Sequence, residues 1–503
     1  MFWNDKLSIY IESYETFSNT FSMNTDQSDF ITPTIFVESL ESSEFTGFLE
    51  SLNNSDSPLV SITLPIAGID PLAALELHPD YEEKFYWDHP ENSISISAAG
   101  KVRELKSTGP DRFKDISEQT ISVKEEIQAY TAIEHSMAGP LFLGGYSFTD
   151  HNVGKIWNTF GAARFILPEW MLIESGNLHL LTVIIEKEGR EAHDIYQEII
   201  MRITDFLNIA GELESLIEPE PQSHNILCTL ETNCDKEKWI KNVEKAKDLI
   251  DRGKFEKIVL ARSVTYTSPK KIKSTVVAHQ LREKYPECYN FLIQKDNDTS
   301  FVGATPERLA SFKNGVFTTE GLAGSTSRGN SAIEDAVLAK SLLSSEKDQN
   351  EHQFVVRAIG NSLEKFSNKI DHPGQPEIKK LKNVQHLFTP ISADIIKGVQ
   401  IHELIRELHP TPAVGGFPKS DAVLYIREIE SLERGWYSGP VGWFNMHGFG
   451  EFAVAIRSAL LYKNSATLYA GCGIVDDSQP ENEWNETILK FKPLLDALQK
   501  TDS

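Results

Sequence analysis

At 503 residues the chain is long enough for two or three ordinary domains or for one large unit. Hydrophobic residues make up 40% of it and aromatic residues 10%, which is enough for a sizeable core and excludes a largely disordered chain. The formal net charge of −24 argues against nucleic acid and anionic membranes as partners, whereas a local cation can still attract a small anionic substrate.

The cellular setting is predicted from the cysteines and from the N-terminus. Cysteines occur at Cys228, Cys234, Cys288 and Cys472, with neither a CxxC pair nor the spacing of a disulfide framework. The first residues lack a basic region followed by an apolar run, so no signal peptide is expected. No stretch approaches the roughly 20 apolar residues of a membrane helix. We therefore expect a soluble, cytoplasmic protein, whose oligomeric state the sequence does not define.

In the first part of the chain, residues 1–30 are polar and are expected to dock loosely. Short β-like runs follow, among them VSITLPIAGI (60–69) and NLHLLTVIIEKEG (177–189), and then an amphipathic helix over about 191–216. The segment EPEPQSH (218–224) has two prolines among polar residues and predicts a linker. The chain is accordingly divided into two regions, 1–215 and 216–503.

The second region opens with a predicted helix that has Asp235 as its N-cap and Trp239 on its apolar stripe. Gly253 is expected to end this helix, and the strand FEKIVLARSVTY (255–266) follows. Near the C-terminus, GEFAVAIRSALLY (450–462) and ATLYAGCGIV (466–475) each have the pattern of a strand. The short turn KNSA between them predicts a hairpin.

Lys257 is the first candidate for chemistry. In a strand, Phe255, Lys257, Val259 and Ala261 would share one face, because side chains alternate with period two. Apolar surroundings disfavour the ammonium form and lower the pKa of a lysine, which would let it act as a general base near pH 7. The alternative is a lysine on an edge strand whose ammonium group reaches water, and spacing alone favours that reading.

Glu307 follows the turn-forming Pro306 in GATPERL, with Arg308 next to it. In a closed pocket the pKa of this carboxyl would rise, and the group could protonate a leaving hydroxyl. A surface glutamate paired with a neighbouring arginine is an equally good interpretation of the same residues.

Two pairs of acidic residues are each spaced three apart, Asp348 with Glu351 and Glu483 with Glu486, which places each pair on one helical face. Like charges at that spacing destabilise a helix unless a cation or a basic group compensates. Together the pairs could supply oxygen ligands to Mg²⁺, which often binds through one or two carboxylates plus substrate. The alternative is two solvated acidic helix faces, which are common in so acidic a chain.

Arg457 would alternate with small alanines along its predicted strand, which leaves space for bidentate capture of a carboxylate. A structural ion pair under a helix is the alternative. Gly471 and Gly473 would let a ligand approach the backbone closely. Since GCGIVD lacks a third glycine, it is not a dinucleotide fingerprint, and HExxH, GxSxG and P-loop motifs are also missing.

Taken together, these segments resemble the chorismate-utilising enzymes, the family of isochorismate synthase, salicylate synthase, anthranilate synthase component I and aminodeoxychorismate synthase. The resemblance runs from about Trp239 to Leu495, whereas 1–215 resembles the family's variable half only loosely. It implies an α+β fold of two packed antiparallel β-sheets flanked by helices, with 216–503 as the chorismate-binding region and both regions forming one unit. The motifs that carry it, in order, are KIVLAR, FVGATPERL, GLAGSTSRG, SEKDQNEH, NVQHL, LHPTPAVGGFP, ERGWYSGPVGW, FAVAIRSAL, AGCGIV and PENEWNETILK.

Within the family, LHPTPAVGGFP (408–418) looks most like isochorismate synthase. Members that add water carry a lysine at the position of Lys257. Aminodeoxychorismate synthases commonly place a lysine nucleophile where this chain has Ala323, so the nucleophile here must come from solvent. The implied reaction is Mg²⁺-dependent addition of water at C2 of chorismate with loss of the C4 hydroxyl. Its product is isochorismate, for menaquinone or siderophore biosynthesis.

The resemblance also implies a role for each site residue. Lys257 would deprotonate the water and Glu307 would protonate the leaving hydroxyl. Glu351 and Glu486 would hold Mg²⁺, with Asp348 and Glu483 in support, although some relatives have glutamate at position 348. The substrate-binding candidates are Ser325 (threonine in many relatives), His386, Tyr437, Arg457, Gly471 and Lys490.

Three other functions stay open. Salicylate synthase would use the same residues and then eliminate pyruvate from bound isochorismate. Anthranilate synthase component I is disfavoured by Lys257, although FVESLES (36–42) faintly resembles its amino-acid feedback motif. A non-catalytic member that keeps the pocket belongs to a different class, and lack of turnover by an intact fold would reveal it.

Overall fold

The structure of the protein is a computed structural model that describes residues 39–66, 68–89, 93–150, 154–211, 228–382 and 384–502. The segment 1–30 and the predicted linker at 218–224 lie outside the described residues, so those two predictions are not addressed by the structure. In the described part of the chain, none of the helices is long and apolar enough to cross a membrane. The cysteines are all described and form no disulfide.

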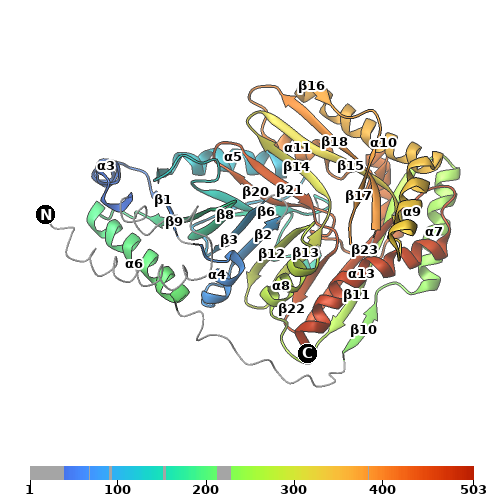
Figure 1. Cartoon of the computed structure of the whole chain (residues 1–503), viewed down its shortest axis with the longest axis horizontal. Helices are drawn as coiled ribbons and strands as arrows, with labels where there is room; N and C mark the ends of the chain where they lie inside the picture. The colour runs from blue at the N-terminus through green and yellow to red at the C-terminus, as the bar shows by residue number, and fades with distance from the viewer. Residues whose placement is uncertain are drawn as a thin grey trace.

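Two large sheets organise the described residues, and every strand pairing within them is antiparallel except the one between β1 and β5. Figure 1 shows the sheets with helices on their outer faces. The α+β architecture of two packed, mostly antiparallel sheets is therefore confirmed. The first sheet has the order β10 (Thr229–Thr232), β11 (Lys257–Thr267), β23 (Ser465–Ile474), β22 (Ser458–Tyr462), β13 (Thr299–Thr305), β12 (Tyr289–Asp296), β2 (Lys84–His89), β3 (Ile94–Ala99), β8 (Trp170–Ser175), β9 (Leu178–Glu186), β1 (Leu59–Pro65) and β5 (Ile127–Thr131), and β19 (Gly416–Phe417) pairs with β11.

The second sheet has fewer strands, and its strand β14 begins directly after Glu307. Its order is β16 (Ser367–Asp371), β18 (Val384–Ile395), β15 (Val316–Ser327), β14 (Arg308–Lys313), β21 (Gly450–Val454), β20 (Pro440–Asn445), β6 (Leu141–Tyr146), β7 (Ala163–Leu167) and β4 (Arg103–Ser107), and β17 (Glu377–Lys380) pairs with β18.

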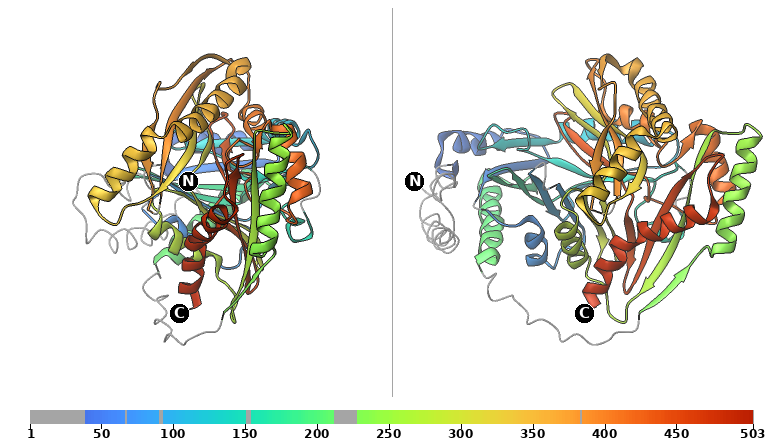
Figure 2. Two further views of the ribbon diagram at one scale, coloured as in Figure 1. Left: turned by 90° about the vertical axis from the view of Figure 1, so that its right-hand side faces the viewer. Right: turned by 45° about the vertical axis from the view of Figure 1, so that its right-hand side comes forward.

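Helices cover these sheets. Helices α3 and α6 lie at one end of the molecule, and α7, α10 and α13 lie toward the other (Figure 1 and the right-hand view of Figure 2). The α-helices are α3 (Ser43–Leu52), α4 (Pro71–Leu77), α5 (Arg112–Glu125), α6 (Ala192–Gly211), α7 (Lys236–Asp251), α8 (Ser274–Lys284), α9 (Ala332–Ser344), α10 (Glu346–Leu363), α11 (Ile401–Leu408), α12 (Lys419–Ile429) and α13 (Pro480–Asp502), with 3₁₀ turns η3 (Lys155–Trp157) and η5 (Glu364–Phe366).

Both sheets run without interruption through the two regions of the chain. In the first sheet β12 pairs with β2, with Phe291 opposite Trp87. In the second, β20 pairs with β6, with Trp443 opposite Leu143. All four side chains belong to one buried cluster, so the regions share a core. The exact boundary between 1–215 and 216–503 stays a prediction.

The helix predicted from Asp235 is confirmed in detail. The Asp235 side chain accepts a hydrogen bond from the backbone of Lys238 at 2.8 Å, which satisfies one of the free N–H groups at the helix start. Trp239 and Val243 are buried on its inner face. Beyond its end, Gly253 has φ 68°, a left-handed conformation that glycine adopts without steric cost.

The prediction of one strand over 450–462 is wrong, because the chain changes sheets within it. Residues up to Val454 form β21 of the second sheet, and those from Ser458 form β22 of the first. Arg457, between them, has φ 51°, which no extended strand allows. The hairpin beyond the switch is confirmed, since Tyr462 pairs with Ser465 where β22 meets β23.

Candidate active site

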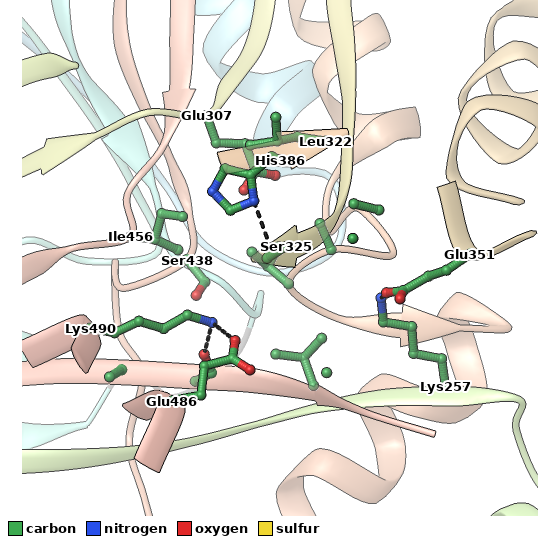
Figure 3. Close-up of a pocket in the computed structure, with 18 of the residues that line it drawn as sticks. Lys257, Glu307, Leu322, Ser325, Glu351, His386, Ser438, Ile456, Glu486 and Lys490 are labelled. Carbon is green, nitrogen blue, oxygen red and sulfur yellow. Dashed lines mark hydrogen bonds and ion pairs between the residues drawn. The ribbon is translucent and has the colours of Figure 1, made fainter. Parts of the chain in front are cut away.

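A cavity of about 270 Å³ lies where the two sheets approach each other, bordered by β11 and β23 of the first sheet and β15 and β18 of the second. Helices α10 and α13 contribute the two acidic pairs (Figure 3). Every site residue predicted from the sequence lines this cavity. They are Lys257, Glu307, Ser325, Asp348, Glu351, His386, Tyr437, Arg457, Gly471, Glu483, Glu486 and Lys490.

Lys257 begins β11 and is 8% exposed. Its ammonium donates to Glu351 Oε1 at 2.5 Å, so the predicted base contacts a predicted metal ligand (Figure 3). The reading as an edge-strand lysine is wrong, because β11 pairs on both sides and Lys257 itself lies opposite Phe417. On the neighbouring strand β23, Gly473 leaves room for the methylene chain of Lys257, since a Cβ at position 473 would lie 2.7 Å from Lys257 Cε.

Glu307 is also 8% exposed. Burial raises the pKa of its carboxyl to about 7, with the nearby Glu320 carboxylate acting in the same direction. The alternative of a surface glutamate paired with Arg308 is wrong, because that guanidinium instead donates to the Tyr289 hydroxyl at 2.7 Å. A carboxyl with this pKa is partly protonated near neutral pH and can donate a proton.

The two acidic pairs lie on different helices but reach the same cavity. On α10, Glu351 is held by Lys257. On α13, Glu486 Oε1 accepts from Lys490 at 2.5 Å. Burial alone would raise the pKa of Glu486, but the Lys490 ammonium outweighs it and the pKa is lowered. Burial and the neighbouring Glu486 together raise the pKa of Glu483.

This donor set fits a hard cation shared with a substrate. Among the described residues no group of three or more His, Cys, Asp and Glu side chains is arranged to hold a metal alone. Mg²⁺ does not need such a cage, because it keeps several waters and binds through one or two carboxylates plus substrate oxygens. Carboxylates from two helices around one cavity meet that requirement, and the repulsion between Glu483 and Glu486 is what a cation would relieve.

Arg457 supplies positive charge to the cavity wall. It lies in the sheet switch, the segment between Val454 and Ser458 where the chain passes from the second sheet to the first, and it borders the cavity. In the described part of the chain no carboxylate forms an ion pair with its guanidinium. Tyr437 is 3% exposed and stacks on Tyr469 with ring centroids 5.1 Å apart. Burial raises the pKa of Tyr437 to about 12, so its hydroxyl stays protonated and can donate to an anion.

The remaining substrate-binding candidates contact one another. The Ser325 hydroxyl and His386 Nδ1 lie 2.7 Å apart on the paired strands β15 and β18. Burial lowers the pKa of His386 to about 3, and the nearby Arg457 cation contributes, so the imidazole is neutral at pH 7. Lys490 donates to the Gly471 carbonyl at 2.7 Å, which joins two residues predicted separately.

Several lining residues were not predicted. Tyr469 precedes Gly471 by two residues on β23, so period-two alternation could have found it. Ile456 and Ser438 lie in or beside the sheet switch, where Ser438 has φ 62°, and no strand pattern places them. The other lining residues are Val259, Pro306, Leu322, Gly324, Lys347, Ala413, Val414, Ala470, Val475 and Ser478, together with Ala323 and Gly473, which the sequence had already placed next to a ligand.

A buried ion pair behind the cavity was also missed. Glu430 and Arg434 are 2.6 Å apart and lie four residues apart in sequence. Glu430 accepts from the backbone of Ala261 at 2.6 Å, and Arg434 donates to the carbonyls of Val259 at 2.8 Å and Val414 at 3.0 Å. The pair therefore fixes β11 against the segment that follows α11.

Comparison with known proteins identifies the class. The family described as "Chorismate binding enzyme" matches residues 46–499. The chain therefore belongs to the chorismate binding enzyme family, as the motifs predicted.

Individual relatives extend over most of the chain. It is 35% identical to isochorismate synthase MenF of Bacillus subtilis over 448 residues, 88% of this chain and 93% of the relative. It is 34% identical to the salicylate biosynthesis isochorismate synthase of Pseudomonas aeruginosa over 450 residues, 88% and 90% respectively. Among solved structures, the menaquinone-specific isochorismate synthase MenF of Escherichia coli aligns with a TM-score of 0.73 at 24% identity, covering 91% of this chain and 100% of that one. That likeness supports the fold.

Proposed function

We propose that this chain is an isochorismate synthase, an isomerase that converts chorismate to isochorismate. The observation that carries the proposal is one cavity bordered by a buried lysine, Lys257, and a buried carboxyl of raised pKa, Glu307. An addition of water coupled to loss of hydroxide needs one group of each kind. The relatives named isochorismate synthase, at 34% and 35% identity, support the same activity.

In the proposed reaction the neutral amine form of Lys257 takes a proton from a water molecule as the water oxygen bonds to C2 of chorismate. The two ring double bonds shift, the bond between C4 and its hydroxyl breaks, and Glu307 gives its proton to that hydroxyl. One water is consumed and one is released, so substrate and product are isomers. Ala323, on the cavity wall, offers no competing amine.

The substrate is a dianion, and we assign its two carboxylates to different parts of the cavity. Arg457 and the Tyr437 hydroxyl would bind the pyruvyl carboxylate, with Lys490, Ser325, His386 and the Gly471 backbone completing the site. Glu351 and Glu486 would hold Mg²⁺, with Asp348 and Glu483 in support. When bound, the cation neutralises the ring carboxylate.

We expect Glu351→Gln and Glu486→Gln each to raise the Mg²⁺ concentration for half-maximal activity by about tenfold or more, equivalent to about 1.4 kcal/mol of binding free energy. Each change removes an anionic oxygen from a hard-cation site while keeping the shape of the side chain. The measurement is a Mg²⁺ titration of initial rate at saturating chorismate. Glu346→Gln on α10 and Glu481→Gln on α13 are matched controls, since both carboxylates are exposed. Unchanged titration curves in both cavity variants would mean that these carboxylates hold no metal.

The proposal is tested by identifying the product from chorismate and Mg²⁺. Isochorismate alone is the expected result. Salicylate with an equal amount of pyruvate would identify a salicylate synthase, and anthranilate formed with ammonia would identify the amine-adding branch. No turnover by the folded protein would indicate a non-catalytic member. We place the activity in the cytoplasm on the cysteine spacing, feeding either menaquinone or a catecholate or salicylate product.

A further inference from the structure

An ion pair between Glu320 and Lys379, outside the predicted site, forms hydrogen bonds to the backbone on both sides of Glu307. The Glu320 carboxylate accepts a hydrogen bond from the backbone N–H of Arg308 at 3.1 Å. The Lys379 ammonium donates to the carbonyl of Pro306 at 3.3 Å. The two side chains contact each other, with Lys379 Nζ 3.2 Å and 3.3 Å from the Glu320 oxygens. The peptides before and after Glu307 are thus both bound by one charged pair.

The pair comes from strands that are remote from Glu307 in sequence. Glu320 lies on β15 and Lys379 on β17, and both strands pair with β18. Glu320 is 8% exposed, whereas the Lys379 side chain is 26% exposed. Since β18 also carries His386, the pair is built into the same wall as the substrate-binding candidates.

Four side chains influence the charge of the Glu307 carboxyl. They are Glu320, Lys379, Lys490 on α13, and Thr411, whose hydroxyl donates to Glu307 Oε1 at 3.5 Å. Glu320 favours the protonated carboxyl because like charges repel, while both lysines and the threonine favour the carboxylate. Glu320 and Lys379 are thus coupled to Glu307 through space with opposite signs.

We propose that Glu320 and Lys379 are positioning residues that hold Glu307 in place and set the pH range over which it carries its proton. The proposal rests on the assignment of Glu307 as the general acid. Neither residue lines the cavity, so neither is expected to touch the substrate. A merely structural pair would affect the amount of active enzyme. If the pair sets the ionisation of Glu307, removing one of its members would also change the pH dependence of activity. The direction of that change would depend on whether the negative or the positive charge is removed.

The test compares Glu320→Gln with Lys379→Met in pH profiles of kcat/KM. The glutamine keeps an acceptor for the Arg308 N–H, and the methionine keeps the length of the lysine stem. In the parent enzyme one apparent pKa near 7 is expected from Glu307. It should fall by about half a pH unit or more in Glu320→Gln and rise by a similar amount in Lys379→Met. Lys380→Met on the same strand and Glu377→Gln, both exposed, are the matched controls and should leave it in place.

A second readout does not depend on turnover. Infrared difference spectra between each protein and the same protein carrying Glu307→Gln follow the protonated carboxyl band of Glu307 directly across pH. Opposite displacements of that titration in Glu320→Gln and Lys379→Met would support the proposal even if the parent makes a product other than isochorismate. Titrations that stay in place, or that move in the same direction in both variants, would overturn it. Failure of the proposed function would show separately, in the product of the parent enzyme.

Discussion

Replacement of Lys257 by alanine is expected to lower kcat by about 10²–10⁴-fold, the usual contribution of a general base. The folded state should survive, since Lys257 is at the start of its strand and its ammonium faces the cavity. Chorismate binding should also persist, because Arg457 and Tyr437 are untouched. The measurements are single-turnover rates and substrate affinity, with the thermal unfolding midpoint as a check on folding.

A charge-preserving variant distinguishes the role of Lys257 as a general base from its role as a cation paired with Glu351. Arginine at this position would keep a cation against Glu351, which Lys257 contacts at 2.5 Å, but it cannot be deprotonated. Lys257→Arg should therefore be about as inactive as the alanine variant. Lys254→Ala, an exposed lysine three residues earlier, should behave like the parent. Activity of Lys257→Arg within a few-fold of the parent would remove Lys257 from the base role and leave it a purely electrostatic one.

Loss of the proton donor should be as damaging. Glu307→Gln keeps the size of the side chain and an acceptor for Thr411, but it removes the proton that the leaving hydroxyl requires. A fall in kcat of about 10²–10⁴-fold is expected. Since burial raises the pKa of Glu307 to about 7, the residual activity should also lose the apparent pKa near 7 that the parent shows.

The control for this change is Glu256→Gln, which removes an exposed carboxylate in the same half of the chain. It should leave both the rate and the pH profile unchanged. If Glu307→Gln keeps most of the parent's kcat, the proton reaches the leaving group from another donor, and the raised pKa of Glu307 has no catalytic use.

Features set by neighbouring residues were the ones that the sequence predicted best. The N-cap at Asp235 and the stop at Gly253 depend on local hydrogen bonds and backbone conformation, and both are present. The hairpin of β22 and β23 likewise depends on a short turn between two apolar runs. The spacing of the acidic pairs correctly predicted that each pair reaches the same surface of its helix, since all four residues line the cavity.

Features that depend on residues far apart in sequence were missed, because local sequence patterns do not show which distant segments come into contact. The chain changes sheets between Val454 and Ser458, where Arg457 adopts φ 51°, and apolar alternation along the segment does not reveal this change. The contact of Lys257 with Glu351 joins residues 94 positions apart, and the Glu320–Lys379 pair joins residues 59 apart. Period-two spacing predicted which face of the strand carries Lys257, but it could not show which residues lie opposite the lysine. Membership of the family, carried by ordered motifs, supplied the remainder of the candidate site.

The source of the new hydroxyl tests the central claim most directly. Chorismate is converted by the enzyme in ¹⁸O-labelled water with Mg²⁺, and the isochorismate is analysed by mass spectrometry and by NMR for the position of the label. With Lys257 activating water and Glu307 releasing the C4 hydroxyl, one ¹⁸O is expected at C2 of every product molecule formed in the first turnover. Unlabelled isochorismate would show that the C4 hydroxyl migrates within the ring. An amino product formed in ammonium buffer would show that water is not the nucleophile. Either result would contradict the account.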